Sequence, residues 1–399
     1  MAEEATTTGR ELDVVLLGAT GFTGRLTAHE LAARARGTRI RWGIAGRDTG
    51  RLGALAAELG GTDGDGPQVL RADVTDVGSL TDLASRTRVL ATTVGPYARF
   101  GLPVARACAE QGTHYADITG EEGYVRMLER EVDATARANG ATMVVCCGFD
   151  SVPHDLGVRF LVSHLPDEAD VVVRGYVRAT GRMSGGTART ALDTLSGAAS
   201  VPDRVETGAE DARPVERLRL GVHRPERLGG WAVPMPTVDP MIVLRSARVL
   251  PGYGELFVYG HFAHLRRTTT LVAGGLALGT AALAARTGPG RAALERLLPS
   301  PGEGPDAAAR AAGRFTVLLV ATAHGRHEDE DVRAIARVRG GDPGYGETSR
   351  MLAEAALTLA SDERPDVTGV VTPAVGLGAP YQRRLEAGGM RFELVERRP

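Results

Sequence analysis

The chain has 399 residues, of which 43% are hydrophobic and 24% charged, and its formal net charge is −2. This length allows two or three domains with a sizeable core, and the near-neutral charge gives no reason to expect a nucleic-acid partner. All 47 basic residues are arginine, so chemistry that needs a lysine base or a lysine Schiff base is excluded. The three cysteines match neither a disulfide framework nor a zinc pattern, and we expect no metal site. Residues 1–11 are polar and do not resemble a signal peptide, so we expect a cytoplasmic protein.

The first predicted unit is a strand, a tight turn and the start of a helix. An apolar run at residues 14–17 leads into three glycines, Gly18, Gly21 and Gly24, at three-residue spacing. In a dinucleotide-binding fold the first glycine allows the turn, the second admits the pyrophosphate and the third lets the helix pack close to the sheet. The helix N-terminus adds free N–H groups and a partial positive charge for the phosphates. We therefore favour a dinucleotide site over a purely structural turn, and its expected residues are Gly18, Ala19, Thr20, Gly21, Phe22, Thr23 and Gly24.

The second predicted strand, at residues 40–45, bears on which nicotinamide cofactor is bound. In folds that prefer NAD, this strand ends in an acid that binds the ribose hydroxyls, whereas a nearby arginine accommodates the 2′-phosphate of NADP. Arg47 follows the strand here and favours NADP(H); the alternative is a solvated surface charge. Asp48 and Asp76 are expected to cap the helices that follow them. Asp73, at the end of the third strand, fits an adenine contact or a turn equally well.

Gly95-Pro96-Tyr97 follows the fourth predicted strand, at the sheet edge where ligands bind in open α/β folds. We expect Gly95 and Pro96 to lie near the nicotinamide ribose. Tyr97 fits a proton donor or a stacking group, and equally an aromatic residue packed at a domain interface. Asp117 and Glu121 lie at the next strand-end turn, although an acid at 121 also suits the first turn of a helix. Strands and helices alternate up to about residue 150, which predicts a doubly wound parallel sheet.

The stretch 148–157 leaves the sixth predicted strand at the same edge and begins a helix. Pro153 suits a first helical turn, and Asp150 or Ser151 suits the cap. His154 has no such local explanation and lies beside the expected nicotinamide pocket, which makes it a candidate proton donor. Because a lone histidine is more often structural, that alternative stays open.

Beyond residue 169 the pattern indicates a second, α+β domain with a mostly antiparallel sheet. Its strands are expected at 170–178, 242–246, 255–262, 314–322 and 332–338. Ser184-Gly185-Gly186-Thr187 precedes a helix whose N-terminus fits a substrate carbonyl or carboxylate, or simply a loop and cap. The predicted organisation is a Rossmann domain in 1–155, a substrate domain in 156–341 and a return segment in 342–399 that packs on the first domain.

Residues 268–285 form an uncharged, apolar stretch between Arg266-Arg267 and Arg286. Its length is marginal for a membrane span, which needs about 20 residues. It is rich in Ala, Gly and Thr, and a span would separate the residues after 285 from the rest of the chain. We therefore expect an apolar helix, buried or lying on a membrane or lining a lipid channel, rather than a transmembrane segment.

Taken in order, these motifs resemble the saccharopine dehydrogenase-like oxidoreductases, in the branch that holds the trans-acting enoyl reductases and an animal lipid-droplet-associated homologue. The resemblance rests on residues 18–24, 45–47, 94–97, 115–121, 148–157, 184–187, 344–346 and 369–394. It implies a Rossmann domain with an inserted α+β domain, NADP(H) as cofactor, and membrane or lipid association, peripheral at the plasma membrane. It leaves the substrate and the catalytic residues open, and it leaves a homodimer as one option for the oligomeric state.

Three functions follow from these observations. The first is an NADPH-dependent reductase of an enoyl or related group on a lipid or polyketide chain, free or carried on a synthase, with Tyr97 or His154 as proton donor. The second is an amino-acid dehydrogenase of the saccharopine type, whose carboxylate substrate would call for Arg174, Arg178, Arg182 and Arg189. The third is a cofactor-binding scaffold or sensor without turnover, because no obvious catalytic constellation is present.

Overall fold

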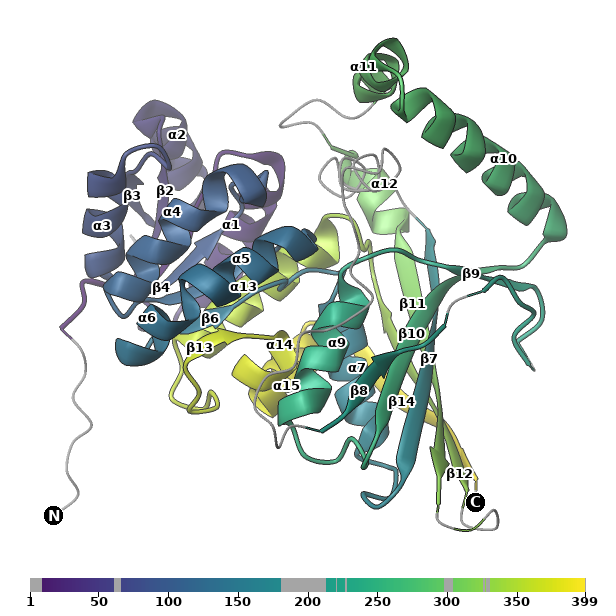
Figure 1. Ribbon diagram of the computed structural model, residues 1–399. Coiled ribbons are helices and arrows are strands. Elements are labelled where there is room, and N and C mark those ends of the chain that lie inside the picture. The colour runs from purple at the N-terminus through teal and green to yellow at the C-terminus, as the bar shows by residue number, and fades with distance from the viewer. Residues whose placement is uncertain are drawn as a thin grey trace, which may run out of the picture.

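The computed structural model describes residues 9–60, 66–180, 213–219, 221–226, 228–297, 304–325, 327 and 331–398. The calls on Ser184-Gly185-Gly186-Thr187, Arg182 and Arg189 lie outside these residues. Two seven-stranded sheets lie side by side, with the chain crossing between them at residues 145–170 and again near the C-terminus (Figure 1).

The first sheet is parallel and has the strand order β13-β6-β5-β4-β1-β2-β3. This is the doubly wound sheet that the sequence predicts, with six of its strands in place before residue 150. Its strands are β1 (Leu12–Leu17), β2 (Trp42–Gly46), β3 (Gln68–Arg71), β4 (Thr87–Thr92), β5 (His114–Asp117), β6 (Thr142–Val144) and β13 (Gly369–Val371). The helices between them are α1 (Phe22–Ala35), α2 (Thr49–Leu59), α3 (Val77–Ser85), α4 (Tyr97–Glu110), α5 (Glu122–Glu131) and α6 (Asp133–Ala138).

Local chemistry explains why these helices begin where they do. The carboxylates of Asp48 and Asp76 accept hydrogen bonds from the backbone N–H groups of Arg51 and Ser79, at 3.0 and 3.3 Å. Each carboxylate satisfies an amide that the helix itself leaves unpaired. The two predicted caps are therefore confirmed. Inside the sheet, Val14 of β1 lies between Trp42 of β2 and Val89 of β4, and all three are buried, as expected for a central parallel strand.

The second sheet is mixed and mostly antiparallel, with the order β14-β12-β11-β7-β10-β8, and β9 pairs with β10. Its strands are β7 (Asp170–Thr180), β8 (Val215–Arg217), β9 (Trp231–Pro234), β10 (Phe257–Leu265), β11 (Arg314–His324), β12 (Val332–Gly340) and β14 (Arg391–Arg398). The helices α7 (Val152–Val162) and α9 (Asp239–Val249) pack against one face of it.

The expectation of a strand at 242–246 is wrong, because these residues lie in α9. Asp239 and Pro240 open this helix, which then packs between α7 and β10. Eight of its 11 residues are buried, so it is apolar on more than one side and shows no helical stripe. A short apolar run of this kind cannot be told from a buried strand by periodicity.

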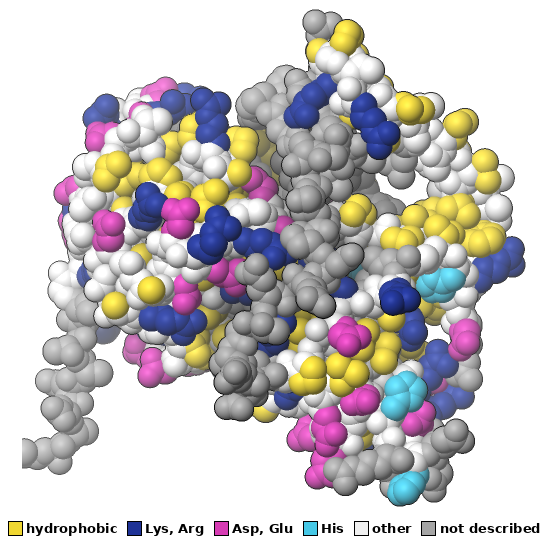
Figure 2. Space-filling model, in the orientation of Figure 1, with side chains coloured by type: hydrophobic (Ala, Val, Ile, Leu, Met, Phe, Trp, Pro, Cys, Tyr) yellow, Lys and Arg dark blue, Asp and Glu magenta, His cyan; other side chains and the backbone are white. Residues whose placement is uncertain are grey.

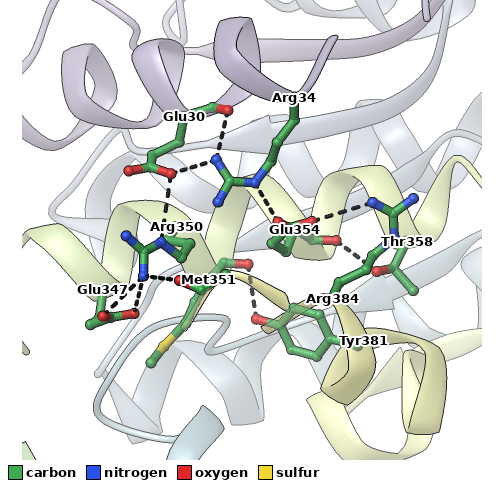
Figure 3. A network of polar contacts seen from close by, with 10 residues as sticks. Glu30, Arg34, Glu347, Arg350, Met351, Glu354, Thr358, Tyr381 and Arg384 are labelled. Carbon is green, nitrogen blue, oxygen red and sulfur yellow. Dashed lines mark hydrogen bonds and ion pairs between the residues drawn. The ribbon is translucent and has the colours of Figure 1, made fainter. Parts of the chain in front are cut away.

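The C-terminal segment 342–399 contributes to both sheets. Its helices are α13 (Gly346–Leu359), α14 (Pro373–Gly376) and α15 (Gly378–Ala387). β13 pairs with β6 of the first sheet, and β14 pairs with β12 of the second. Helix α13 packs on α1, and charged side chains cross that contact (Figure 3). Glu354 of α13 is 5% exposed and binds Arg34 of α1 and Arg384 of α15.

Helix α10 (Thr268–Ala285) projects away from both sheets (Figure 1). It is long and apolar enough to cross a membrane, and only 6% of it is buried. The chain then forms α11 (Gly288–Leu297) and α12 (Ala307–Ala312) before it re-enters the second sheet as β11. β10, which precedes α10, and β11, which follows it, both pair with β7. The segment that contains α10 therefore leaves and re-enters the same sheet, which argues against a single transmembrane crossing by α10.

A half-buried histidine in the first sheet makes stability depend on pH. Thr142 N–H donates to Nδ1 of His114 at 3.0 Å, and burial, with Arg364, Arg88 and Arg10 nearby, lowers the pKa of His114 to about 3. In the unfolded chain this pKa is about 6.5, so stability present above that pH is lost as the pH falls toward the folded value, by up to about 1.4 kcal/mol per pH unit. We expect His114→Asn to flatten urea-unfolding stability between pH 6 and 4, while His29→Asn, at an exposed site, leaves the slope unchanged. Equal slopes in both variants would contradict this assignment.

Candidate active site

The glycine motif forms the tight turn between β1 and α1. Gly18 has φ of +88°, and a Cβ placed there would lie 2.7 Å from Cγ2 of Val94. A Cβ at Gly24 would lie 2.1 Å from the carbonyl oxygen of Gly18, so α1 passes directly against the turn. Gly21 is exposed at the N-cap of α1, where no side chain of the described residues caps the helix. The first N–H groups of α1 therefore remain available to a pyrophosphate.

Phe22, at the start of α1, joins this turn to the segment that returns from α11. Its ring meets that of Tyr345 edge-on, with centroids 4.7 Å apart. The guanidinium of Arg310 in α12 lies 5.7 Å from the same ring, and Gly304 packs so closely that a Cβ there would lie 2.3 Å from Cε1 of Phe22. The glycine turn is thus flanked by residues from late in the chain.

Two arginines follow β2, the strand that pairs with β1. Arg47 is exposed directly after β2, and Nη2 of Arg51, in the first turn of α2, donates to the carbonyl of Thr20 at 3.3 Å. Asp73 forms a turn: its Oδ1 accepts from the N–H and hydroxyl of Thr75 at 2.9 and 2.8 Å. These hydrogen bonds, followed by the nearby charge of Arg47, lower the pKa of Asp73. Both arginines suit the 2′-phosphate of NADP.

The loops after β4 and β5 are fixed to each other at the edge where the nicotinamide would lie. Gly95 and Pro96 are exposed there. The Glu121 carboxylate accepts hydrogen bonds from the N–H groups of Tyr97 and Ala98, both at 2.9 Å, and so caps α4. The Tyr97 side chain turns inward instead. Its buried hydroxyl donates to the carbonyl of Thr92 at 2.9 Å and accepts from Ile118 N–H at 3.3 Å, and burial raises its pKa well above 10. This position does not favour Tyr97 as a proton donor.

Asp117 fixes the backbone of the loops after β5 and β6 by hydrogen bonds. It is fully buried and accepts hydrogen bonds from Cys146 N–H, Thr119 N–H and the hydroxyl of Tyr115, at 2.9, 3.0 and 2.9 Å. Burial raises its pKa to about 6. The bond to Cys146 holds that residue at φ of +60°, a conformation that a non-glycine residue adopts at a cost. The loop after β6, which leads to His154, is therefore held in one shape.

His154 lies in a buried cluster of ionisable groups in the second domain. It occupies the first turn of α7, and it meets Asp239 from the first turn of α9 and His261 from the middle of β10; the three are 2%, 2% and 0% exposed. Nδ1 of His154 is 2.7 Å from Oδ1 of Asp239, and Nε2 of His261 is 3.6 Å from Oδ2. Burial alone would raise the pKa of Asp239, but the two imidazoles and its hydrogen bonds lower it. The carboxylate is therefore charged.

Comparison with known proteins assigns the chain to a family. Residues 14–144 match the model of the saccharopine dehydrogenase NADP binding domain. The chain is 36% identical to a Mycobacterium tuberculosis protein named for trans-acting enoyl reductase activity, over 97% of this chain and 98% of the relative. It is 33% identical to the trans-acting enoyl reductase of Mycobacterium ulcerans, over 96% and 97% of the two chains. The chain belongs to the trans-acting enoyl reductase family.

Among solved structures, the fold matches saccharopine dehydrogenase (L-Glu forming) of Saccharomyces cerevisiae. The TM-score is 0.54 at 14% identity, covering 96% of this chain and 100% of the yeast chain. At this identity the likeness shows a shared fold only. The expected fold class and family are confirmed, and NADP(H) is the cofactor of the first domain.

Several residues of this family member's site could not be found from the sequence. Asp239 and His261 meet His154 only because α9 and β10 pack on α7, and no short motif joins the three. Arg51 could have been found, because it lies in the first turn of the helix that Asp48 caps, a few residues after Arg47.

The two arginines predict how the enzyme selects its cofactor. We expect Arg47→Gln and Arg51→Gln each to weaken NADPH binding by about 10- to 100-fold, since a hydrogen bond to a charged group contributes about 1.5–3 kcal/mol. NADH lacks the 2′-phosphate, so its affinity should change little. Titration of protein fluorescence with both cofactors measures this, with Arg36→Gln at the exposed C-terminal end of α1 as control. An equal loss for NADPH and NADH would show that neither arginine reads the 2′-phosphate.

Proposed function

We propose that this protein is an NADPH-dependent reductase of an enoyl group on an acyl chain, free or attached to a carrier. The observation that carries this proposal is the identity of 33–36% over nearly the full length with proteins named trans-acting enoyl reductases. The glycine turn, the free N-terminus of α1 and the two arginines fit the phosphates of NADP(H). When bound, the cofactor supplies a hydride to the β-carbon of the enoyl group.

Reduction also needs a proton at the α-carbon, and His154 suits this role better than Tyr97. The Tyr97 hydroxyl is engaged with backbone groups on both sides. Nδ1 of His154 lies at ion-pair distance, 2.7 Å, from Oδ1 of Asp239, while Nε2 is buried with no ion-pair or hydrogen-bond partner among the described residues. When the ring carries a second proton, on Nε2, it can deliver that proton to a substrate atom while Asp239 faces Nδ1.

The second candidate function, on a saccharopine-like substrate, has less support. His261 of β10 is paired with Gly175 of β7, so these two positions point to the same face of the sheet. Arg174 and Arg178 are an odd number of residues away from Gly175, so their side chains lie on the opposite face. Arg178 contacts His264 there, at 3.3 Å. The described arginines of β7 therefore do not converge on the cluster that contains His154.

The test is NADPH oxidation with unsaturated acyl thioesters, on a simple thiol and on an acyl carrier protein. We expect saturated product, deuterium at the β-carbon from C4-labelled NADPH, and a loss of about 100-fold or more in kcat for His154→Gln. Activity on saccharopine but on no thioester would overturn the proposal in favour of an amino-acid dehydrogenase. Tight NADPH binding without turnover of either substrate class would overturn it in favour of a scaffold or sensor.

We also propose that α10 rests in the surface layer of a membrane or lipid body, from the cytoplasmic side. Val272, Leu276 and Leu283 are 65%, 70% and 68% exposed on a helix that is about 27 Å long at a rise of about 1.5 Å per residue. Figure 2 shows hydrophobic side chains along this helix and basic side chains near its outer end. Arg266, Arg267 and Arg286 flank it, which suits anionic headgroups.

Sedimentation with vesicles tests this contact. The wild type is expected to bind vesicles containing phosphatidylglycerol, and Leu276→Asp combined with Val272→Asp to release it. Val77→Asp, at an equally exposed apolar residue of α3, is the matched control. Equal binding by all three proteins would rule out α10 as the contact.

A further inference from the structure

In the buried cluster around Asp239, the contacts determine which atoms donate hydrogen bonds and which accept them. The hydroxyl of Thr237 contacts Oδ2 of Asp239 and lies 2.8 Å from Nε2 of His261. A hydroxyl has one hydrogen, and a charged carboxylate can only accept, so Thr237 donates to Asp239. His261 must then donate its Nε2–H to the Thr237 oxygen. This places a hydrogen on Nε2 of His261, and a second hydrogen on Nδ1 would have no acceptor among the described residues, so the ring is neutral.

Because His261 is neutral, the negative charge of the Asp239 carboxylate has His154 as its partner. Burial lowers the pKa of His261 to about 4, which agrees with its neutral state. The other ionisable groups that reach the cluster are Tyr259 of β10, whose ring centroid is 6.0 Å from that of His261, and Arg217 of β8. Burial raises the pKa of Tyr259 well above 10, so it is neutral. Within the described residues, the close group that can meet the carboxylate with a positive charge is His154, at 2.7 Å.

A metal ion is the competing explanation, because two imidazoles and a carboxylate are a common ligand set and their ligand atoms lie within 4.8 Å of one another. A metal-bound histidine, however, almost always donates its second ring N–H to a carboxylate, a carbonyl or water. Here the outer nitrogens, Nε2 of His154 and Nδ1 of His261, have no such partner in the described parts of the chain. The arrangement lacks the support that a metal centre needs.

We propose that Asp239, held by Thr237 and His261, is the positioning residue that fixes His154 with its hydrogen on Nδ1 and directs Nε2 toward the substrate. This inference rests on the proposed function and names the machinery behind its proton donor. Phe149, from the loop after β6, touches the His154 ring edge-on at 6.1 Å and Phe315 at 4.9 Å. It is half-buried.

The test uses Asp239→Asn and Thr237→Val in the full-length protein, with Asp331→Asn as the matched control. Asp331 forms the same kind of contact with His324, at 2.9 Å, on the surface. Long-range proton–nitrogen NMR of ¹⁵N-histidine protein reports which ring nitrogen of His154 carries the hydrogen. In the neutral ring, observed at the alkaline end of a pH series, we expect hydrogen on Nδ1 in the wild type and in Asp331→Asn, and on Nε2 in Asp239→Asn.

Kinetics give a second, separate readout. In Asp239→Asn we expect kcat to fall by about 100-fold or more, because the His154 ring is no longer held with its hydrogen on Nδ1. Thr237→Val should give a smaller change in the same direction, with NADPH affinity unchanged in both variants.

The outcomes separate the two proposals. If the hydrogen moves to Nε2 but no thioester is reduced even by the wild type, the positioning role stands and the proposed function fails. If the hydrogen stays on Nδ1 in Asp239→Asn, or if the purified wild type holds one equivalent of metal by elemental analysis, the positioning role is overturned.

Discussion

Gly24→Ala is expected to abolish most NADPH binding and to lower the free energy of unfolding by about 1–3 kcal/mol, the usual cost of overfilling a packed site. The new Cβ would lie 2.1 Å from the Gly18 carbonyl oxygen and 2.8 Å from Oγ1 of Thr93. The turn cannot retreat easily, because Gly18 N–H donates to the Ala45 carbonyl at 2.9 Å and the Gly18 oxygen accepts from Gly21 N–H at 3.0 Å. Helix α1 must therefore tilt away, and its N-terminus leaves the position of the pyrophosphate.

Calorimetric titration with NADPH and urea unfolding measure the two effects. Gly53→Ala is the matched control, since Gly53 lies in α2 with open space where its Cβ would be. That change should stabilise the protein by about 0.5–1 kcal/mol and leave NADPH binding intact. Wild-type affinity in Gly24→Ala would mean that the cofactor binds elsewhere.

The first sheet was predictable because its information is local. A run of apolar residues, three spaced glycines and two capping aspartates each act within a few positions of the chain. Their physical roles do not depend on the rest of the fold, so alternating strands and helices could be placed in order up to residue 150.

The second domain was harder to predict, because an element that is buried on several sides does not show the spacing of apolar residues that distinguishes a helix from a strand. Helix α9 is covered by α7 on one side and β10 on another, and Met241, Ile242, Val243 and Leu244 are all buried in succession. Four consecutive apolar residues fit a strand as well as a helix, and only the tertiary contacts decide between them.

The candidate site likewise has one part that the sequence could predict and one part that it could not. Its cofactor half lies in loops at strand ends, and there Arg47 and the glycines could be named from position alone. Its proton-transfer half depends on packing: Tyr97 turns into the core, and His154 gains its partners from α9 and β10. The chemistry of His154 is thus set by residues far from it in the sequence, which no local pattern could show.

Glu354→Gln is expected to have the second largest effect, because Glu354 joins three helices (Figure 3). Its carboxylate is 6% exposed and binds Arg34 and Arg384, whose side chains are 20% and 39% exposed. Removing the charge leaves Arg34 paired with Glu30, at 2.5 Å, and leaves Arg384 without its contact to the Glu354 carboxylate. Because both arginines still reach water, the cost is smaller than for a fully buried pair, and we expect a loss of about 1–3 kcal/mol.

The matched control is Glu363→Gln, which breaks the exposed pair with Arg383 of α15, at 2.9 Å and 71% and 62% exposure. It should change the urea midpoint little, since exposed ion pairs contribute about 0–1 kcal/mol. Glu354→Gln should also weaken NADPH binding, because α13 supports the helix whose N-terminus holds the phosphates. Lower stability with unchanged NADPH affinity would show that α1 keeps its position without this contact, and an unchanged urea midpoint would show that the network does not hold α13 on the first domain.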